Sequence, residues 1–248
     1  MNRAGFMQFI LEQYSVEPDY PWMKNPNFAV FRHSNNQKWF ALIMDIPIAH
    51  YYQRVPFVRN HPQAIDLDML VMELMGGSIK MFPLSKDGSM LGMTAHERLI
   101  IRMELEDGTI ICDTLRPKDI VIDSSLAGFH NTGVRNFTLA HEIGHQLLHI
   151  YYPLLALSDQ LEEDCADIIA EGLLLPECLV RASMAFFQFP DTLSHISRSQ
   201  LDMNYPSFKK MARQLGVQRQ LLANRMKYLH ILTSDVPYRH TLSLMEAG

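Results

Sequence analysis

Hydrophobic and polar positions follow two different periods along this chain, and the change lies near residue 137. Between residues 78 and 123, short runs rich in Ile, Val and Leu are separated by turn residues, which is typical of β-strands. After residue 137, apolar residues recur every three or four positions, which is typical of amphipathic helices. The pattern predicts an α+β chain in which a small β-sheet precedes a mostly helical half.

The strand-like runs predict two hairpins. Residues 99–105 and 109–112 flank an Asp-Gly turn, which is a strong short-range hairpin signal. Near the N-terminus, a short helix ending near Tyr14 precedes β-prone runs at 29–33 and 38–44, which flank a Ser/Asn turn. Ile120–Asp123 is expected as a further short strand, and helices are expected over residues 65–75, 137–150, 161–174, 176–187, 205–215 and 218–232.

The composition is that of an ordinary globular protein and excludes several classes. Hydrophobic residues make up 48% and charged residues 20% of the 248 residues, which is enough to bury a core. The net charge of −5 argues against a chain coated with nucleic acid. No apolar run approaches the ~18–20 residues of a membrane span, so no membrane partner is expected. Three cysteines without a CxxC pair favour the reducing cytoplasm.

A His-Glu-x-x-His pattern at residues 141–145 is the strongest chemical signal in the chain. On a helix, His141 and His145 lie one turn apart on the same face and can hold one zinc ion. Glu142 follows the first histidine and can take a proton from an activated water. The flanking residues are mostly apolar, so these polar groups are expected to face a core, where they need a partner. The pattern therefore predicts a metal site rather than incidental histidines on a solvated helix.

The third ligand is expected from the acidic, amphipathic stretch over residues 161–174, because hydrolytic zinc sites use three protein ligands. Glu163 shares a face with the apolar stripe and with Asp167 one turn later. This arrangement offers Glu163 as the ligand and Asp167 as the acceptor for a ligating imidazole N–H. Glu162 is the competing ligand at a different angle, and Asp164 and Cys165 are weaker alternatives. The acidic cluster also complements a helix N-terminus, which is the structural reading of Glu162 and Asp164.

His149 follows His145 by one further turn, but we do not expect it to be a ligand. Its distance from His141 is two turns, which is too far for both to share one tetrahedral ion with His145. The sequence also has no HExxHxxGxxH pattern, because no glycine turn follows the second histidine. We interpret His149 as a packed or capping histidine.

The runs VRNFTLAHEIGHQLLH and EEDCADIIAEGLLLP, at residues 134–149 and 162–176, closely resemble the ImmA/IrrE family of zinc metallopeptidases. The resemblance covers about residues 63–232. It implies a zincin-like (minigluzincin) fold with zinc as cofactor, held by His141, His145 and Glu163, with Glu142 as the general base. It also implies limited proteolysis of a protein substrate, a helix-turn-helix transcriptional repressor.

Two further expectations come with the family. The strand Ile120–Asp123 resembles the family's edge strand, which would hold an extended substrate by β-augmentation. Ile169 stands where the family usually has Phe, and Cys165 where Glu is common, but neither departure removes a ligand. The group that stabilises the oxyanion is open, and the candidates are His130, His195, Tyr151 and Tyr152.

The C-terminal segment 205–232 has the outline of a helix-turn-helix around Gly216 and contains no acidic residue. Its charge could serve nucleic-acid binding. We favour a helical region that packs on the peptidase with its basic face solvated. Substrate docking or DNA mimicry is a third reading. The basic side chains are Lys209, Lys210, Arg213, Arg219, Arg225 and Lys227.

The expected domains are therefore 1–50, 63–200 and 201–248. Within the first of these, about residues 6–47 resemble the opening of the MmcQ/YjbR family, but the second half of that domain does not follow. A helix plus a hairpin is too small to be stable alone and is expected to pack on another part. The alternative function for the whole chain is a zinc-containing DNA-binding or partner-binding transcriptional regulator without proteolysis.

Overall fold

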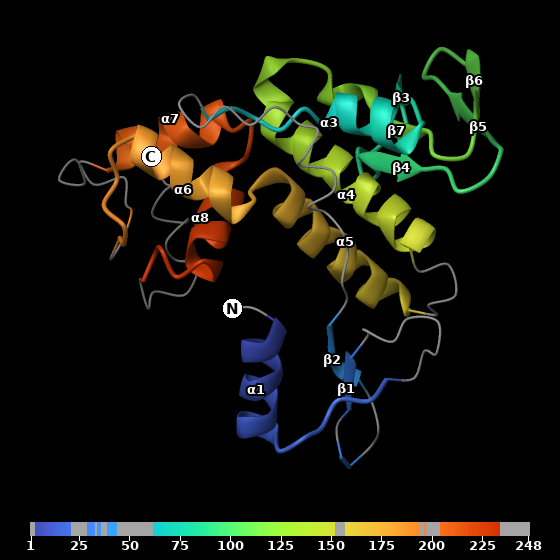
Figure 1. The fold of residues 1–248 in the computed structure, drawn as a ribbon. Helices are drawn as coiled ribbons and strands as arrows, with labels where there is room; N and C mark the ends of the chain where they lie inside the picture. Colours follow the sequence, from blue (N-terminus) through green and yellow to red (C-terminus); the bar gives the residue numbers. More distant parts are fainter. Residues whose placement is uncertain are drawn as a thin grey trace. The chain divides into compact units, whose positions relative to one another are not determined.

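The computed structural model describes residues 3–20, 29–32, 34–35, 39–43, 62–151, 157–193, 196 and 204–233 (Figure 1). The chain divides into two compact units, Met1–Pro47 and Ile48–Gly248. Both units mix helices and strands, so the predicted α+β class is confirmed. The domain boundaries inferred from the sequence stay predictions. Within the described part of the chain, no helix combines the length and the apolar character that crossing a bilayer requires.

The first unit consists of helix α1, Arg3–Tyr14, and an antiparallel hairpin of β1, Ala29–Arg32, and β2, Trp39–Ile43. The helix and the hairpin confirm the sequence prediction. Ile10 packs with Ala29 and Phe31 in a small core. So few buried side chains stabilise a unit only weakly, because a hairpin needs a larger apolar face to be independently stable.

The second unit begins with a short helix and a three-stranded sheet. Helix α3, Leu67–Met69, continues as the π-helix η1, Leu70–Met75, and ends at Gly76 with a φ of 70°. The sheet has the order β3–β7–β4, with β3 at Ile79–Phe82, β7 at Ile120–Asp123 and β4 at Gly92–Thr94. Strand β7 pairs parallel with β3 and antiparallel with β4.

The prediction that Ile120–Asp123 is an edge strand is wrong, because β7 is the central strand and all four of its residues are buried. Its composition explains the position. A short apolar run without polar alternation is typical of a strand covered on both faces. The edge next to helix α4 belongs instead to β4 (Figure 1).

The predicted Asp-Gly hairpin is confirmed as β5, Leu99–Glu104, and β6, Ile110–Leu115. Gly108 adopts a φ of 79° in the turn, which a residue with a side chain rarely adopts. The hairpin packs Ile101 and Leu115 into a core shared with Phe82 and Val121 of the sheet.

All of the helices predicted after residue 137 are present, with shifted ends. Helix α4 begins at Thr132 rather than at Phe137, because the 3-10 turn at Phe129–Asn131 leads directly into it. Ser158 accepts a hydrogen bond from the Leu161 N–H at the N-cap of α5. The helices are α4, Thr132–Tyr151; α5, Asp159–Leu174; α6, Glu177–Phe186; α7, Tyr205–Gln214; and α8, Arg219–Tyr228.

Two buried carboxylates tie the sheet to its loops. Asp119 accepts hydrogen bonds from the Ser78 N–H and hydroxyl at 3.1 and 2.8 Å and from the Arg116 N–H at 2.8 Å. Asp123 accepts from the Leu84 N–H at 2.6 Å and the Ser125 N–H at 2.9 Å. Burial raises the pKa of both carboxyls, but these hydrogen bonds outweigh burial and hold each pKa below the ordinary 3.8.

We expect Asp119→Ala to lower the free energy of unfolding by about 2–4 kcal/mol, because it leaves buried N–H groups without an acceptor. The lowered pKa means that Asp119 stabilises the fold fully above pH 3.8 and that this contribution is lost as the pH falls through its folded-state pKa. Urea unfolding of wild type and Asp119→Asn should therefore differ more at pH 7 than below pH 3.8. The exposed Glu97→Gln is the control, and an equal effect of both substitutions at neutral pH would contradict the assignment.

Candidate metal centre

The two histidines of the HExxH pattern converge on one point beside helix α4. His141 and His145 lie one turn apart, and their Nε2 atoms are 3.0 Å from each other. Their side chains are only 17% and 12% exposed. The remainder of this part of the helix is apolar and buried, as the sequence predicted, and this fixes the face that the rings present.

Helix α5 brings Glu163 to the same point. One carboxylate oxygen of Glu163 lies 3.1 Å from His141 Nε2, and the other lies 3.5 Å from His145 Nε2. The two helices cross closely because Gly144 has no side chain. A Cβ on Gly144 would lie 2.9 Å from the carbonyl oxygen of Ala166 in α5. This contact sets the distance from the imidazoles to Glu163.

Carboxylates behind the two rings hold their other nitrogens. Asp167 Oδ1 lies 2.8 Å from His141 Nδ1, and Glu162 Oε1 lies 3.1 Å from His145 Nδ1. These partners assign the ring proton of each histidine to Nδ1, which leaves each Nε2 with a bare lone pair. Asp167 therefore lies where the sequence placed it. Glu162, the competing ligand in the sequence analysis, lies behind His145 instead of beside Glu163.

The three donors fit a metal ion. Two bare imidazole nitrogens and a carboxylate repel one another unless a cation lies between them. Their ligand atoms all lie within 4.8 Å of one another. Donors held tetrahedrally at ~2.0–2.1 Å from zinc would be roughly 3.3–3.4 Å apart, and the distances among His141, His145 and Glu163 are 3.0, 3.1 and 3.5 Å. The donor set is one that zinc commonly takes.

Glu142 lies against the edge strand at the same site. Its side chain is buried, and an added Cβ on Gly92 of β4 would lie 2.7 Å from its Oε1. Burial, and then the negative charge of Glu163, raises the pKa of Glu142 to about 8. A carboxyl with a pKa near neutrality can both accept and release a proton.

A pocket of about 690 Å³ opens over these residues. Its walls come from α4, from Glu163 and Asp167 of α5, and from residues 89–94, which lead into and form β4. Gln146 of α4 fixes this wall, because its Nε2 donates to the hydroxyl of Thr94 and, at 2.9 Å, to the carbonyl of Ala95. The edge of β4 therefore runs beside the metal donors.

The sequence analysis missed two residues at this site. Gln146 is 1% exposed, and a single amide in an otherwise apolar helix could have signalled it. His96 also lines the pocket, and its ring packs against that of His149 with 4.3 Å between the centroids. His149 is thus a packed histidine outside the triad, as expected. His96 follows a strand that is only three residues long, and no local pattern marked it.

None of the residues named as oxyanion candidates lines this pocket in the described part of the chain. His130 lines a different pocket, and Tyr151 lies at the end of α4 away from the donors. Tyr152 and His195 lie outside the described residues. His96 takes their place as the candidate.

Comparison with known proteins gives one long match. The model of the Peptidase_M78 family, described as the IrrE N-terminal-like domain, matches residues 97–227, just over half of the chain. The matched region contains the HExxH helix and helix α5, which together carry the three donors. It also includes the C-terminal helix pair over residues 205–228.

Two short matches cover other proteins only in part. The Uncharacterized protein YyaQ of Bacillus subtilis is 44% identical over 46 residues, which are 18% of this chain and 39% of the relative. A crystal structure of a protein from Pseudomonas syringae is 55% identical over 19% of this chain and 40% of its own, with a TM-score of 0.19. The chain thus spans about two fifths of each relative. The MmcQ/YjbR resemblance of residues 6–47 is not confirmed by them and stays a prediction.

We expect Glu163→Gln and His145→Ala to lose the bound metal, because each removes one of three donors. Glu162→Gln and Asp167→Asn should keep the metal but weaken its affinity roughly 10–100-fold, because each acts through an imidazole. The measurement is metal content after dialysis, followed by competition with a chelating dye. Asp164→Asn is the matched control, since this neighbouring carboxylate bonds to Gln160. Equal metal content in Glu163→Gln and the control would remove Glu163 from the site.

Proposed function

The chain belongs to the Peptidase_M78 family and is a metallopeptidase of the IrrE type, and from this premise we propose that it is a zinc-dependent endopeptidase of a protein substrate. The convergence of the His141 and His145 Nε2 atoms on Glu163, with Glu142 buried beside them, carries the proposal. A structural metal has no use for such a glutamate. This arrangement therefore favours hydrolysis over a regulator without proteolysis.

The residues of the site divide the chemistry among them. His141, His145 and Glu163 would hold zinc, which supplies a Lewis acid for the scissile carbonyl and lowers the pKa of water. Glu142 takes the proton of the attacking water and passes it to the leaving amine. Asp167 holds the His141 ring in one tautomer and orientation. A glutamate as third ligand makes this a gluzincin-type site.

Strand β4 supports an extended peptide as substrate. It is the edge strand of the described sheet, so its outer backbone groups are available for pairing with another chain. Gln146 and the close approach at Gly92 hold this edge against α4, directly beside Glu142. A peptide added along β4 would pass over the metal donors. This role moves from β7, where the sequence had placed it, to β4.

We further propose that the substrate is a helix-turn-helix transcriptional repressor in the cytoplasm. The family resemblance supports the repressor. The free thiols of Cys112, Cys165 and Cys178 support a reducing compartment. The test is incubation of the full chain with the repressor encoded nearest its gene, with and without a chelator. Cleavage that the chelator stops supports the proposal, and an intact repressor in the presence of zinc contradicts it.

Glu142→Gln should keep its zinc and lose repressor cleavage by roughly 10²–10⁴-fold, because an amide cannot accept the proton of the attacking water. Zinc content and the rate of cleavage are measured on the same preparation. Asp164→Asn, an exposed carboxylate outside the pocket, should cleave at the wild-type rate. Undiminished cleavage by Glu142→Gln would assign the proton transfer to another group.

We propose that His96 stabilises the oxyanion, since it lines the pocket and its ring packs on His149. His96→Ala should lower kcat roughly 10–1,000-fold with little change in zinc content, because a group that acts on transition-state charge is removed. Tyr151→Phe is the control, since this hydroxyl belongs to a residue outside the pocket. A loss confined to KM would instead make His96 a substrate-binding residue.

A further inference from the structure

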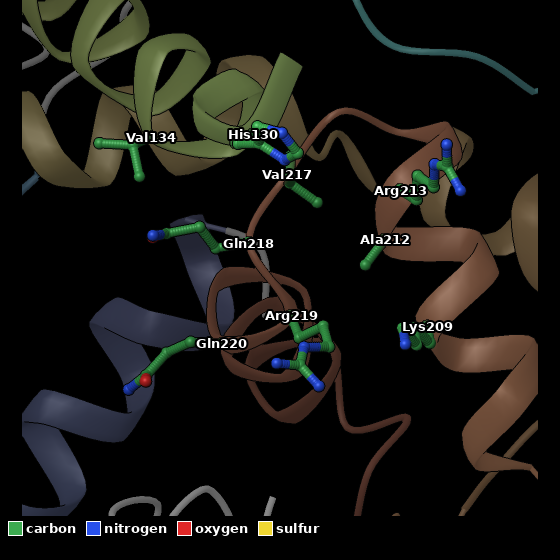
Figure 2. Close-up of a pocket in the computed structure, with 10 residues that line it drawn as sticks. His130, Val134, Lys209, Ala212, Arg213, Val217, Gln218, Arg219 and Gln220 are labelled. Atoms are coloured by element: carbon green, nitrogen blue, oxygen red, sulfur yellow. The ribbon is translucent and has the colours of Figure 1, made fainter. Parts of the chain in front are cut away.

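A second pocket, of about 460 Å³, lies where the start of α4 meets the C-terminal helix pair (Figure 2). It shares no lining residue with the pocket over the metal donors. Helix α4 contributes Gly133 and Val134, α7 contributes Lys209 and Arg213, and α8 contributes the residues of its N-terminal end. Figure 2 shows Lys209 and Gln218 on opposite sides of the pocket, with Arg219 between them.

The pocket is built on close backbone contacts. A Cβ on Gly133 would lie 2.9 Å from the backbone nitrogen of Gln218, so α4 lies directly against the turn between α7 and α8. Asn136 fixes the same turn, because its Nδ2 donates to the Gly216 carbonyl at 2.9 Å. Arg219 in turn donates to the hydroxyl of Tyr205. These contacts hold the walls in a defined arrangement.

The charge of the walls has one sign. Lys209, Arg213 and Arg219 line the pocket, and no described carboxylate lies within 4.0 Å of their charged nitrogens. The whole segment 205–232 contains no acidic residue, although the net charge of the chain is −5. Arg213 is in the last turn of α7, where a cation also suits the helix dipole.

Arg219 has no such local explanation. It is the first residue of α8, where the helix dipole disfavours a positive charge. The first turn of α8 has no acidic residue, and Gln218 makes no side-chain capping bond. A conflict between local preference and observed sequence is typical of a functional site. An anion in the pocket would satisfy both Arg219 and the N–H groups of the first turn.

We propose that this pocket binds a small phosphate-bearing molecule of the size of a mononucleotide. Its volume lies in the usual range for small-molecule sites, ~300–1,000 Å³. A DNA-reading helix needs its N-terminal residues free to enter a major groove. Here that end of α8 lies against α4, where Gly133 leaves no space beside Gln218. The concave site therefore fits a small anion better than a duplex.

The test is calorimetric titration of the full chain with AMP and, separately, with inorganic phosphate. Lys209→Gln and Arg213→Gln should each weaken binding roughly 10-fold, because each removes a charge-assisted contact. Both residues are exposed and lack structural ion pairs in the described region, so both variants should fold. Lys210→Gln is the matched control, since this exposed lysine is next to Lys209 but does not line the pocket.

The outcomes separate the possible ligands. Tighter binding of AMP than of phosphate, lost in the two variants and kept in the control, supports a nucleotide. Equal affinities with the same variant pattern support a site for phosphate groups in general. No saturation with either probe at about 10 mM, a concentration that detects even millimolar affinities, would overturn the proposal. Binding unchanged in both variants would overturn it as well. If a short DNA duplex binds and Lys210→Gln weakens it equally, the surface is a nucleic-acid face.

Discussion

The close crossing of α4 and α5 at Gly144 is the constraint on which the site depends. The backbone of α4 lies against Ala166 there, at a distance that leaves no room for a side chain on Gly144. Because α4 carries the imidazoles and α5 carries Glu163, the crossing distance decides whether three ligand atoms can meet within a few ångströms. The same crossing places Asp167 and Glu162 behind the two rings. One packing contact thus sets both the donors and the groups that orient them.

The site joins electrostatic groups that would oppose one another in isolation. Four carboxyl groups and two imidazoles lie in a partly buried cluster, and the pKa of Glu142 rises to about 8 because of burial and the charge of Glu163. A cation between the donors resolves this opposition and explains why the cluster can be retained. The fold stabilises the cluster from outside, through the buried carboxylates Asp119 and Asp123, which fix the sheet that supports β4.

Strand β4 brings the sheet and the helices together at the reacting centre. It is short, it lies at the sheet edge, and Gln146 holds it against α4. Gly92 lets its backbone approach Glu142 so closely that the carboxyl group is removed from water. The basic helix pair α7–α8 packs on the other end of α4 through Gly133 and Asn136. Helix α4 therefore connects two pockets of different charge, one at each part of its length.

The sequence by itself determined the elements and the donors. Helical periodicity, the HExxH spacing and the acidic face of the next helix are local patterns, and they placed His141, His145 and Glu163 correctly beside one another. The tertiary structure alone decided which strand is at the edge, which nitrogen Glu162 faces, and that His96 and Gln146 join the site. These depend on strand order and helix crossing. Both are set by contacts between residues distant in sequence, which a local period does not encode.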